Sequence, residues 1–230
     1  PRHTSPHLAT HLHTSPHLVT LRERMRVDGV PAPETWVAGA VGRLAEAFAE
    51  VGPSFFEATV ALSFLYFAEQ AVDLAVVEVG LGGRLDATTV VMPVVSVVTH
   101  VGLDHTDLLG DTLPAIAREK AGIAKPGVPL LHAVADADAC VALEAEAASR
   151  GATVEAVRAS CTVGVVDPAP LRLRLATPRR DYGTLDVGLP GAHQAWNAVL
   201  AVRAMEGAVP DLSAAAVRAG LVEVVARSGL

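Results

Sequence analysis

Apolar residues follow two alternating patterns along the chain, one typical of helices and one typical of buried strands. Helical spacing of apolar positions predicts helices near residues 34–50, 57–70, 112–122, 137–150, 193–207 and 212–226. Continuous apolar runs predict strands buried on both faces at 72–79, 94–99 and 128–133. Because helical lengths separate these strands, we expect right-handed crossovers and an α/β fold with a mostly parallel sheet flanked by helices.

The pattern changes between about residues 154 and 190. Short apolar runs separated by Pro, Gly and Asp occur there, at Cys161–Val166, Leu171–Ala176 and Thr184–Leu189. This spacing is typical of antiparallel strands or hairpins. We therefore expect a short antiparallel strand region attached to the main sheet.

The strand predicted at 72–79 ends in a carboxylate, Glu78, which is followed at once by Gly80, Gly82 and Gly83. Glycines let a backbone approach a ligand closely, and ligands of open parallel sheets collect at the carboxyl ends of strands. The pattern indicates a binding loop, although an ordinary strand exit with a solvated glutamate has the same sequence. The strand at 94–99 leads into a second polar exit, His100–Asp107.

Composition restricts the class of protein. With 230 residues, 51% of them hydrophobic, the chain has material for a substantial core, as one large domain or as a piece of a larger protein. A net charge of -7 argues against nucleic acid as a partner. Since no apolar run reaches about 18 residues and no signal peptide opens the sequence, we expect no membrane insertion.

Histidines concentrate in a repeat, in which His3–Thr10 recurs with one change as His13–Thr20. Five of the nine histidines lie in the first 20 residues, which suggests a metal site. Pro6 and Pro16 would interrupt a helix aligning these histidines, however, and no Cys or carboxylate accompanies them.

The two cysteines, Cys140 and Cys161, lie far apart in the sequence and lack a metal-type companion. This predicts reduced structural thiols in a cytosolic protein.

Three motifs together resemble the folylpolyglutamate synthase/dihydrofolate synthase family, a branch of the Mur ligase superfamily. They read E-V-G-L-G-G-R-L-D-A-T at 78–88, G-L-D-H-T-D-x-L-G at 102–110 and R-E-K-A-G-I-x-K-P-G-V-P at 118–129. Shorter matches extend the resemblance from about residue 13 to 207, at Thr14–Leu18, Glu23–Arg24, Phe55–Glu57 and Gly191–Ala198. The T-S-P-H-L segment and the G-L-G-G-R-L-D-A-T loop disfavour another Mur-type ligase acting on a cell-wall nucleotide or a cyanophycin-like substrate.

The resemblance implies an ATP-dependent ligase. Such enzymes phosphorylate a carboxylate of folate or dihydropteroate with ATP, and the amine of L-glutamate then attacks the acyl phosphate. Phosphoryl transfer depends mainly on positioning and charge neutralisation, so metal ligands and phosphate donors dominate such a site. The resemblance also implies a cytoplasmic protein that is a monomer at full length and has small-molecule partners.

The resemblance further implies that residues 1–230 form a single incomplete ATP-binding domain, of the Mur ligase central, P-loop NTPase-like type. The family places a G-x-x-x-x-G-K-[ST] phosphate loop before T-S-P-H-L and a D-x-A-H-N motif in a carboxy-terminal domain, and neither occurs in these residues. We therefore expect the chain alone to be inactive. A non-catalytic fragment that binds pterin or a partner protein, and a His-rich metal-binding protein, are the alternatives from other classes.

Three residues match the family's metal site. Glu78 matches the Mg²⁺-bridging glutamate, His105 a ligand of a second metal ion, and Lys120 a lysine that is commonly carbamylated to give that ion an oxygen ligand. Imidazole is an unusual partner for Mg²⁺, so chemistry alone allows a core or outer-sphere role for His105. A lysine near a helix end also serves simply to complement the helix dipole. We expect the three residues to converge at the carboxyl edge of the sheet.

For ATP, Asn197 matches the family's adenine-contacting asparagine, and Gln194 lies one turn earlier. Amide side chains present donor and acceptor together, as an adenine edge requires, although both could instead cap a helix.

The resemblance assigns the pteroate pocket to Ser54, Phe56, Asp86 and Ala87. A Phe face can stack on a flat heterocycle while Asp86 accepts from ring nitrogens, although Phe56 fits a core position equally well. Thr89 departs from the asparagine that usually completes this loop.

Overall fold

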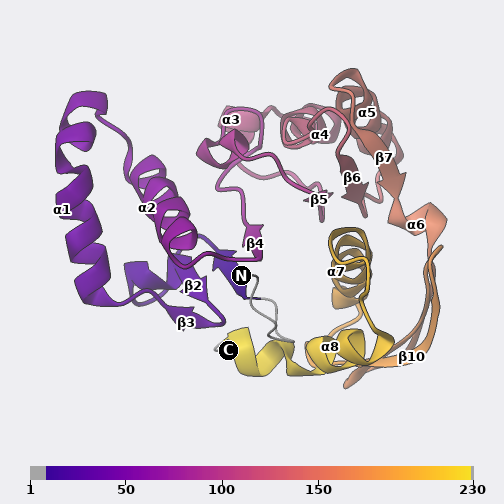
Figure 1. Cartoon of the computed structure of the whole chain (residues 1–230). Coiled ribbons are helices and arrows are strands. Elements are labelled where there is room, and N and C mark those ends of the chain that lie inside the picture. The colour runs from indigo at the N-terminus through magenta and orange to yellow at the C-terminus, as the bar shows by residue number, and fades with distance from the viewer. Residues whose placement is uncertain (1–8, 229–230) are drawn as a thin grey trace. The chain divides into compact units, whose positions relative to one another are not determined.

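The computed structural model describes residues 9–228 of the chain, with side chains through residue 224 (Figure 1). The chain divides into two compact units, residues 1–91 and 92–230. Each unit is a separate arrangement of sheets and helices.

The first unit contains a four-stranded sheet in the order β3-β2-β1-β4. Its strands are β1 Thr10–His13, β2 Met25–Val27, β3 Val30–Pro31 and β4 Leu74–Val77. β1 is antiparallel to β2 and parallel to β4, so the chain crosses over between β1 and β4. The helices of this unit are α1 Glu34–Val51 and α2 Phe55–Glu69, with the 3₁₀ turns η1 Leu21–Arg24 and η2 Ala87–Val90.

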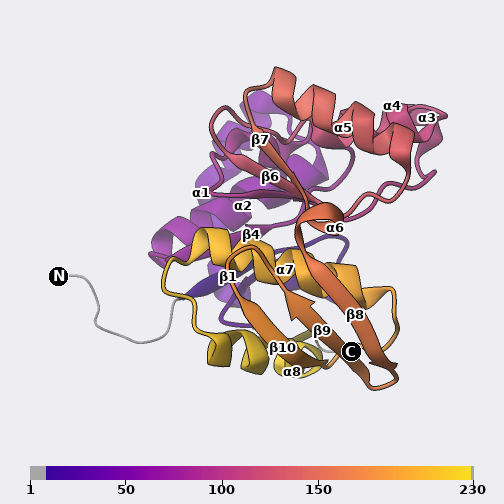
Figure 2. The same ribbon diagram turned by 90° about the vertical axis from the view of Figure 1, so that its right-hand side faces the viewer.

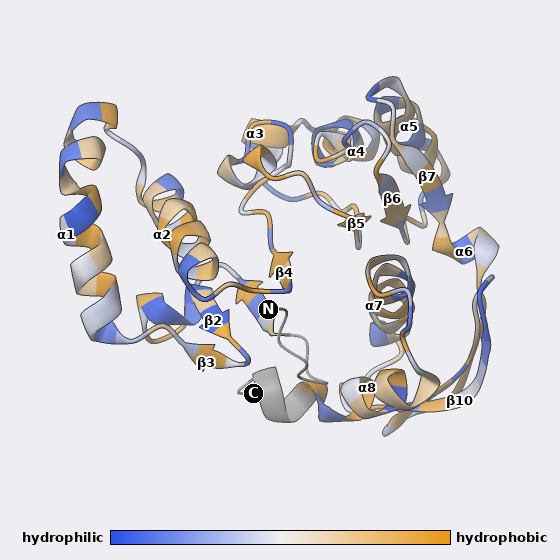
Figure 3. Cartoon of the chain, viewed as in Figure 1, coloured by the Kyte–Doolittle hydropathy of each residue, from blue (hydrophilic) through white to orange (hydrophobic). Residues whose placement is uncertain are grey.

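Local signals explain where the two helices of this unit begin and end. α1 ends at Gly52, which adopts the left-handed conformation with φ 64°. α2 begins with a capping box, in which the Ser54 hydroxyl accepts from the Glu57 N–H and the Glu57 carboxylate accepts from the Ser54 N–H. Figure 3 shows apolar residues around much of α2, as expected of a helix that packs into a core.

β1 buries histidines rather than aliphatic residues. His11 and His13 are both buried, while Leu12 between them is exposed. The Ser63 hydroxyl lies 2.8 Å from Nδ1 of His13, and the His11 ring meets Phe67 edge-on with centroids 4.8 Å apart. Of the repeated segment His3–Thr10, the first six residues lie outside the described part of the chain.

The expectation that 72–79 is buried on both faces is wrong for this strand. Among the described residues β4 pairs only with β1 and is an edge strand, and Val76 is 54% exposed. Val76 is in register with Leu12, so these two exposed apolar side chains share a face. The buried histidines of β1 lie on the opposite face, where α2 packs.

The second unit begins with a parallel sheet in the order β5-β6-β7. Its strands are β5 Ser96–Val98, β6 Pro129–His132 and β7 Thr153–Ala156. The helices that accompany them are α3 Thr106–Leu109, α4 Leu113–Ala121, α5 Ala137–Ser149 and α6 Val157–Ser160. Leu130, Leu131 and His132 are all buried, so the predicted interior strand at 128–133 is confirmed.

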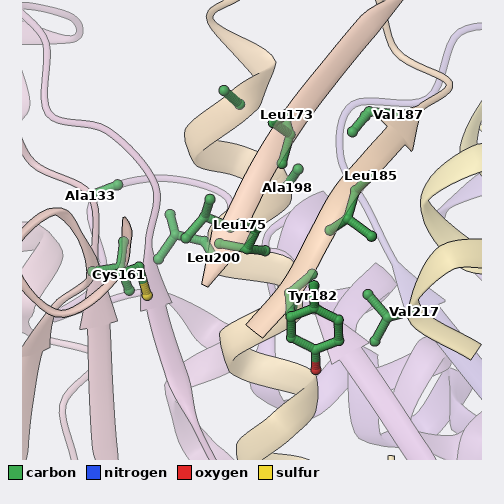
Figure 4. Close-up of a cluster of buried hydrophobic side chains, with 14 of the residues drawn as sticks. Ala133, Cys161, Leu173, Leu175, Tyr182, Leu185, Val187, Ala198, Leu200 and Val217 are labelled. Atoms are coloured by element: carbon green, nitrogen blue, oxygen red, sulfur yellow. The ribbon is translucent and has the colours of Figure 1, made fainter. Parts of the chain in front are cut away.

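An antiparallel sheet in the order β10-β9-β8 follows in the same unit. It contains β8 Thr162–Pro168, β9 Leu171–Ala176 and β10 Asp181–Val187, and the chain ends with α7 Gln194–Ala208 and α8 Ala214–Ser228. Figure 2 shows the three strands side by side. Leu171, Leu173 and Leu175 alternate with exposed arginines and bury one face of β9 in a cluster with Tyr182, Leu185 and residues of α7 (Figure 4).

The α/β class, the parallel sheet flanked by helices and the presence of an antiparallel strand region are confirmed. Within the described residues, the antiparallel strands form a sheet of their own and are not hydrogen-bonded to the parallel sheet, contrary to our expectation. β4 and β5, however, belong to different hydrogen-bonded sheets. None of the helices in the described part of the chain is long and apolar enough to cross a membrane.

Candidate functional site

The loop that leaves β4 meets the end of β1 at Glu78. The Glu78 N–H donates to the His13 carbonyl at 2.9 Å, and the Ser15 N–H donates to Oε2 of Glu78 at 2.8 Å. The Glu78 side chain is exposed. The parallel pairing of β1 with β4 thus brings the T-S-P-H-L segment beside an exposed carboxylate at a strand end.

Asp86 organises this loop from within. One carboxylate oxygen accepts from the backbone N–H groups of Gly80 and Leu81 at 3.0 and 3.1 Å. The other accepts from the Thr88 N–H at 2.9 Å and the Thr88 hydroxyl at 2.6 Å. A carboxylate has about four acceptor positions, and these bonds use them. The assignment of Asp86 to a pterin contact stays a prediction, and its observed partners all belong to its own loop.

Phe56 covers the start of the same loop. A Cβ atom placed on Gly80 would lie 2.5 Å from the tip of the Phe56 ring, so any larger residue there would force the ring to move. The half-buried Phe56 also lies 6.2 Å from the His13 ring, between centroids. Ser54 caps the helix that carries Phe56, and Ala87 begins η2 directly after Asp86. The residues assigned to the pteroate pocket therefore all lie in the first unit. There the Phe56 ring contacts the loop whose backbone is hydrogen-bonded to Asp86.

Two residues without an assigned role complete this region. Arg24 is buried, donates from Nε to Nδ1 of His17 at 2.9 Å and lies over the Phe55 ring at 5.4 Å from its centroid. The Glu23 carboxylate accepts from the N–H groups of Leu18 and of the next two residues. The hydrogen bond from the Leu18 backbone is the main cause of the lowered pKa of Glu23. In the sequence, the only sign that Glu23 and Arg24 belong to this region was that both match the Glu-Arg pair of the family.

His105 and Lys120 lie in the second unit. His105 has φ 48° and ψ 42°, a left-handed conformation that is uncommon for any residue with a side chain. Its side chain is 59% exposed, 3.8 Å from the Asp104 carboxylate. Strain of this kind clusters at ligand and active sites. Glu78 belongs to the other unit, so the convergence of the three residues stays a prediction.

Lys120 lies in the last turn of α4 and is half-buried. Within the described part of the chain its ammonium has no carboxylate within ion-pair distance, although Glu119 precedes it in the sequence. A half-buried lysine that forms no ion pair has an amine available for chemical modification.

Gln194 and Asn197 lie in the first turn of α7 and contact each other. The Asn197 amide donates to Oε1 of Gln194 at 2.8 Å. His193 occupies the cap position and makes no side-chain capping bond, so neither amide caps the helix. The paired amides keep further donors and acceptors for a ligand.

The Mur ligase middle domain family matches residues 35–205. The chain belongs to this family. A dihydrofolate synthase/folylpolyglutamate synthase of Bacillus subtilis is 38% identical over 219 residues, which are 89% of this chain and 51% of the relative. The Mur ligase fold is confirmed by solved structures that are 30% identical or more.

Two of these structures contain ligands. An FPGS–AMPPCP–folate complex matches with a TM-score of 0.84 and 33% identity, over 93% of this chain and 55% of the other. Escherichia coli FolC in complex with DHPP and ADP matches with a TM-score of 0.82 and 30% identity, over 94% of this chain and 50% of the other. The chain thus spans about half the length of these Mur ligase family members.

Proposed function

We propose that these residues belong to a protein that joins L-glutamate to dihydropteroate or a reduced folate, with ATP activating the carboxylate as an acyl phosphate. The chain supplies residues for the nucleotide, the pterin and Mg²⁺. One observation carries the proposal: the loop after β4, with exposed Glu78 at its start, is held by Asp86 beneath the Phe56 ring. The relatives of this sequence are named folylpolyglutamate and dihydrofolate synthases, and related structures bind AMPPCP with folate, or DHPP with ADP.

For the pterin, the geometry favours distinct roles for residues at the start of α2 and residues of the loop after β4. Phe56 offers a partly exposed ring for stacking, whereas Asp86 holds the loop backbone in place through its own hydrogen bonds. Ser54 is engaged in the helix cap and sets the position of Phe56, and half-buried Ala87 lines the loop where η2 begins.

For Mg²⁺, Glu78 fits by chemistry because Mg²⁺ is bound through one or two carboxylates and keeps several waters. The imidazole of His105 and the ammonium of Lys120 are poor ligands for a hard cation as they stand. Reaction of the neutral Lys120 amine with CO₂ forms an N–C bond, releases one proton and gives a carbamate with oxygen donors. We therefore assign carbamylated Lys120 to a second metal site. His105 is assigned to the same site because its G-L-D-H-T-D motif matches the family's, not because imidazole suits Mg²⁺.

For ATP, the paired amides of Gln194 and Asn197 are the proposed adenine contact. The proposal includes a cytoplasmic location and a monomeric full-length protein.

The test is ATP-dependent incorporation of labelled glutamate by a longer protein that contains these residues, with dihydropteroate and with tetrahydrofolate as acceptors. Phe56→Ala is expected to raise the KM for the acceptor about tenfold, which corresponds to about 1.4 kcal/mol of lost contact. Phe48→Ala in α1 is the control, because Phe48 is similarly half-buried in the same unit. A folded protein that uses neither acceptor would contradict the proposal.

A further inference from the structure

A second group of ligand-type side chains lies in the second unit. His132 ends β6 and is fully buried, and Cys140 and Glu144 are one turn apart on α5. Oε1 of Glu144 lies 3.2 Å from Nε2 of His132 and 3.2 Å from Sγ of Cys140. The three ligand atoms all lie within 4.8 Å of one another.

In the folded chain Cys140 lies beside two other metal-type ligands, His132 and Glu144, which its sequence spacing did not indicate. His132 precedes it by eight residues and lies on a strand, and Glu144 follows it by four residues on the same face of a helix. The expectation that Cys140 has no metal-type companion is therefore wrong. Cys161 is buried and outside this group, as expected of a structural thiol.

We propose that His132, Cys140 and Glu144 bind one divalent cation of the zinc class. Thiolate, imidazole and carboxylate together are a donor set of Zn²⁺, whereas Mg²⁺ prefers oxygen alone. At ordinary zinc bond lengths, neighbouring ligand atoms of a tetrahedral ion are about 3.4 to 3.6 Å apart. The two observed distances of 3.2 Å need only a few tenths of an ångström of adjustment, and the third pair, Nε2 of His132 and Sγ of Cys140, lies within 4.8 Å and has to close by at most about 1.2 Å. Binding displaces the thiol proton of Cys140 into water.

The surroundings define the kind of site. The Glu144 side chain is 43% exposed, so an ion can enter from that side and keep a water as its fourth ligand. Coordination through Nε2 places the ring proton of His132 on Nδ1, which is buried and has no partner among the described residues. Metal-binding histidines usually donate that second N–H, so this site binds more weakly than closed structural zinc sites. The inference is independent of the proposed ligase function.

The test is titration of the 230-residue chain with Co²⁺, followed through the sulfur-to-cobalt charge-transfer band. This band reports only thiolate ligands, so it distinguishes the site from the histidines of the amino-terminal repeat. We expect one equivalent of Co²⁺, which Zn²⁺ displaces and Mg²⁺ does not. Cys140→Ser is expected to abolish the band, and the matched Cys161→Ser to preserve it.

Glu144→Gln supplies a second measurement, because this partly exposed change leaves the buried residues in place. We expect it to weaken Zn²⁺ binding at least tenfold, with circular dichroism unchanged. The proposal is overturned by a wild-type chain without the band, by a band that survives in Cys140→Ser, or by Glu144→Gln that binds Zn²⁺ as tightly as wild type.

Discussion

At the scale of single residues, the contact between Gly80 and Phe56 is the feature of the candidate pterin site with the clearest steric consequence. A Cβ atom at Gly80 would lie 2.5 Å from the tip of the Phe56 ring, so the partly exposed ring must move aside, and Gly80→Ala should destabilise the first unit by about 1 kcal/mol, at the low end of overpacking costs. Gly39→Ala is the matched control. It lies within α1 with nothing within 4 Å, so it should stabilise by about 0.5 to 1 kcal/mol.

Urea denaturation followed by circular dichroism measures both changes. Combining Gly80→Ala with Phe56→Leu should recover part of the loss, because the smaller side chain frees space above residue 80. Equal effects of Gly80→Ala and Gly39→Ala would mean that the ring does not restrict this position.

Buried histidines make the stability of the first unit sensitive to acid. Burial lowers the pKa of His13 below its usual 6.5, and the nearby Arg24 guanidinium lowers it further, against a smaller opposite effect from Asp86. Burial also lowers the pKa of His11. The unfolded chain therefore binds protons that the folded unit excludes. Stability should be fully present above about pH 6.5 and decrease as the pH falls through the lower folded-state pKa.

Denaturation at a series of pH values checks this expectation. His13→Gln should make the free energy of unfolding fall less steeply with decreasing pH below about 6.5. The same change at exposed His100 should leave that slope unaltered. An unchanged slope in His13→Gln would assign the acid sensitivity to other groups.

At the scale of elements, periodicity predicted those segments whose burial follows the side-chain pattern. The long helices and the antiparallel strands, such as β9 with its alternating leucines and arginines, lie where the pattern indicated. β1 was not predicted because it buries His11 and His13 and exposes Leu12, the reverse of the usual order. The short β2 and β3 carry too few residues for a period to be visible, and β7 has polar residues at Thr153 and Glu155 in place of a continuous apolar run.

An ion network joins two elements of the second unit. Arg203 of α7 forms a bidentate pair with Glu155 of β7, at 2.9 and 2.6 Å, and reaches Glu206 at 2.6 Å. The Glu206 side chain is only 1% exposed and also accepts from the Tyr182 hydroxyl. Arg203→Met would leave a buried carboxylate without its cation, so we expect a loss of about 3 to 5 kcal/mol in the free energy of unfolding.

Arg172→Met is the control at the same scale. Arg172 pairs with Asp186 at 3.0 Å, but both side chains are about half exposed or more, at 48% and 69%. Such a surface pair contributes about 0 to 1 kcal/mol. Similar losses in the two variants, measured by urea denaturation, would contradict a special role for the buried network.

At the scale of the whole molecule, residue pattern alone indicated one loop of the candidate site, and the roles of the site residues came only through resemblance. Spacing indicated a loop after Glu78, but it could not show that the Asp86 carboxylate accepts its hydrogen bonds from the backbone of that loop. Nor could it place Arg24 over Phe55 or bring His132 to Cys140. These contacts depend on strand pairing and helix packing between distant segments, and residue spacing carries no information about them.

The assignment of Lys120 can be tested directly, because Lys120 and Lys125 are the only lysines in the 230 residues. An unmodified ammonium would repel Mg²⁺ at short range, whereas a carbamate attracts it. With ¹³C-bicarbonate, the chain should therefore show one carbamate resonance that Lys120→Ala removes and Lys125→Ala retains. In a longer, active protein, Lys120→Ala should lower ligase activity at least a hundredfold, and a short carboxylic acid should restore part of it by supplying the missing oxygen. A Lys120→Ala protein with unaltered rate and Mg²⁺ dependence would return Lys120 to the role of a helix-end cation, and would weaken the case for His105 as a ligand of the same ion.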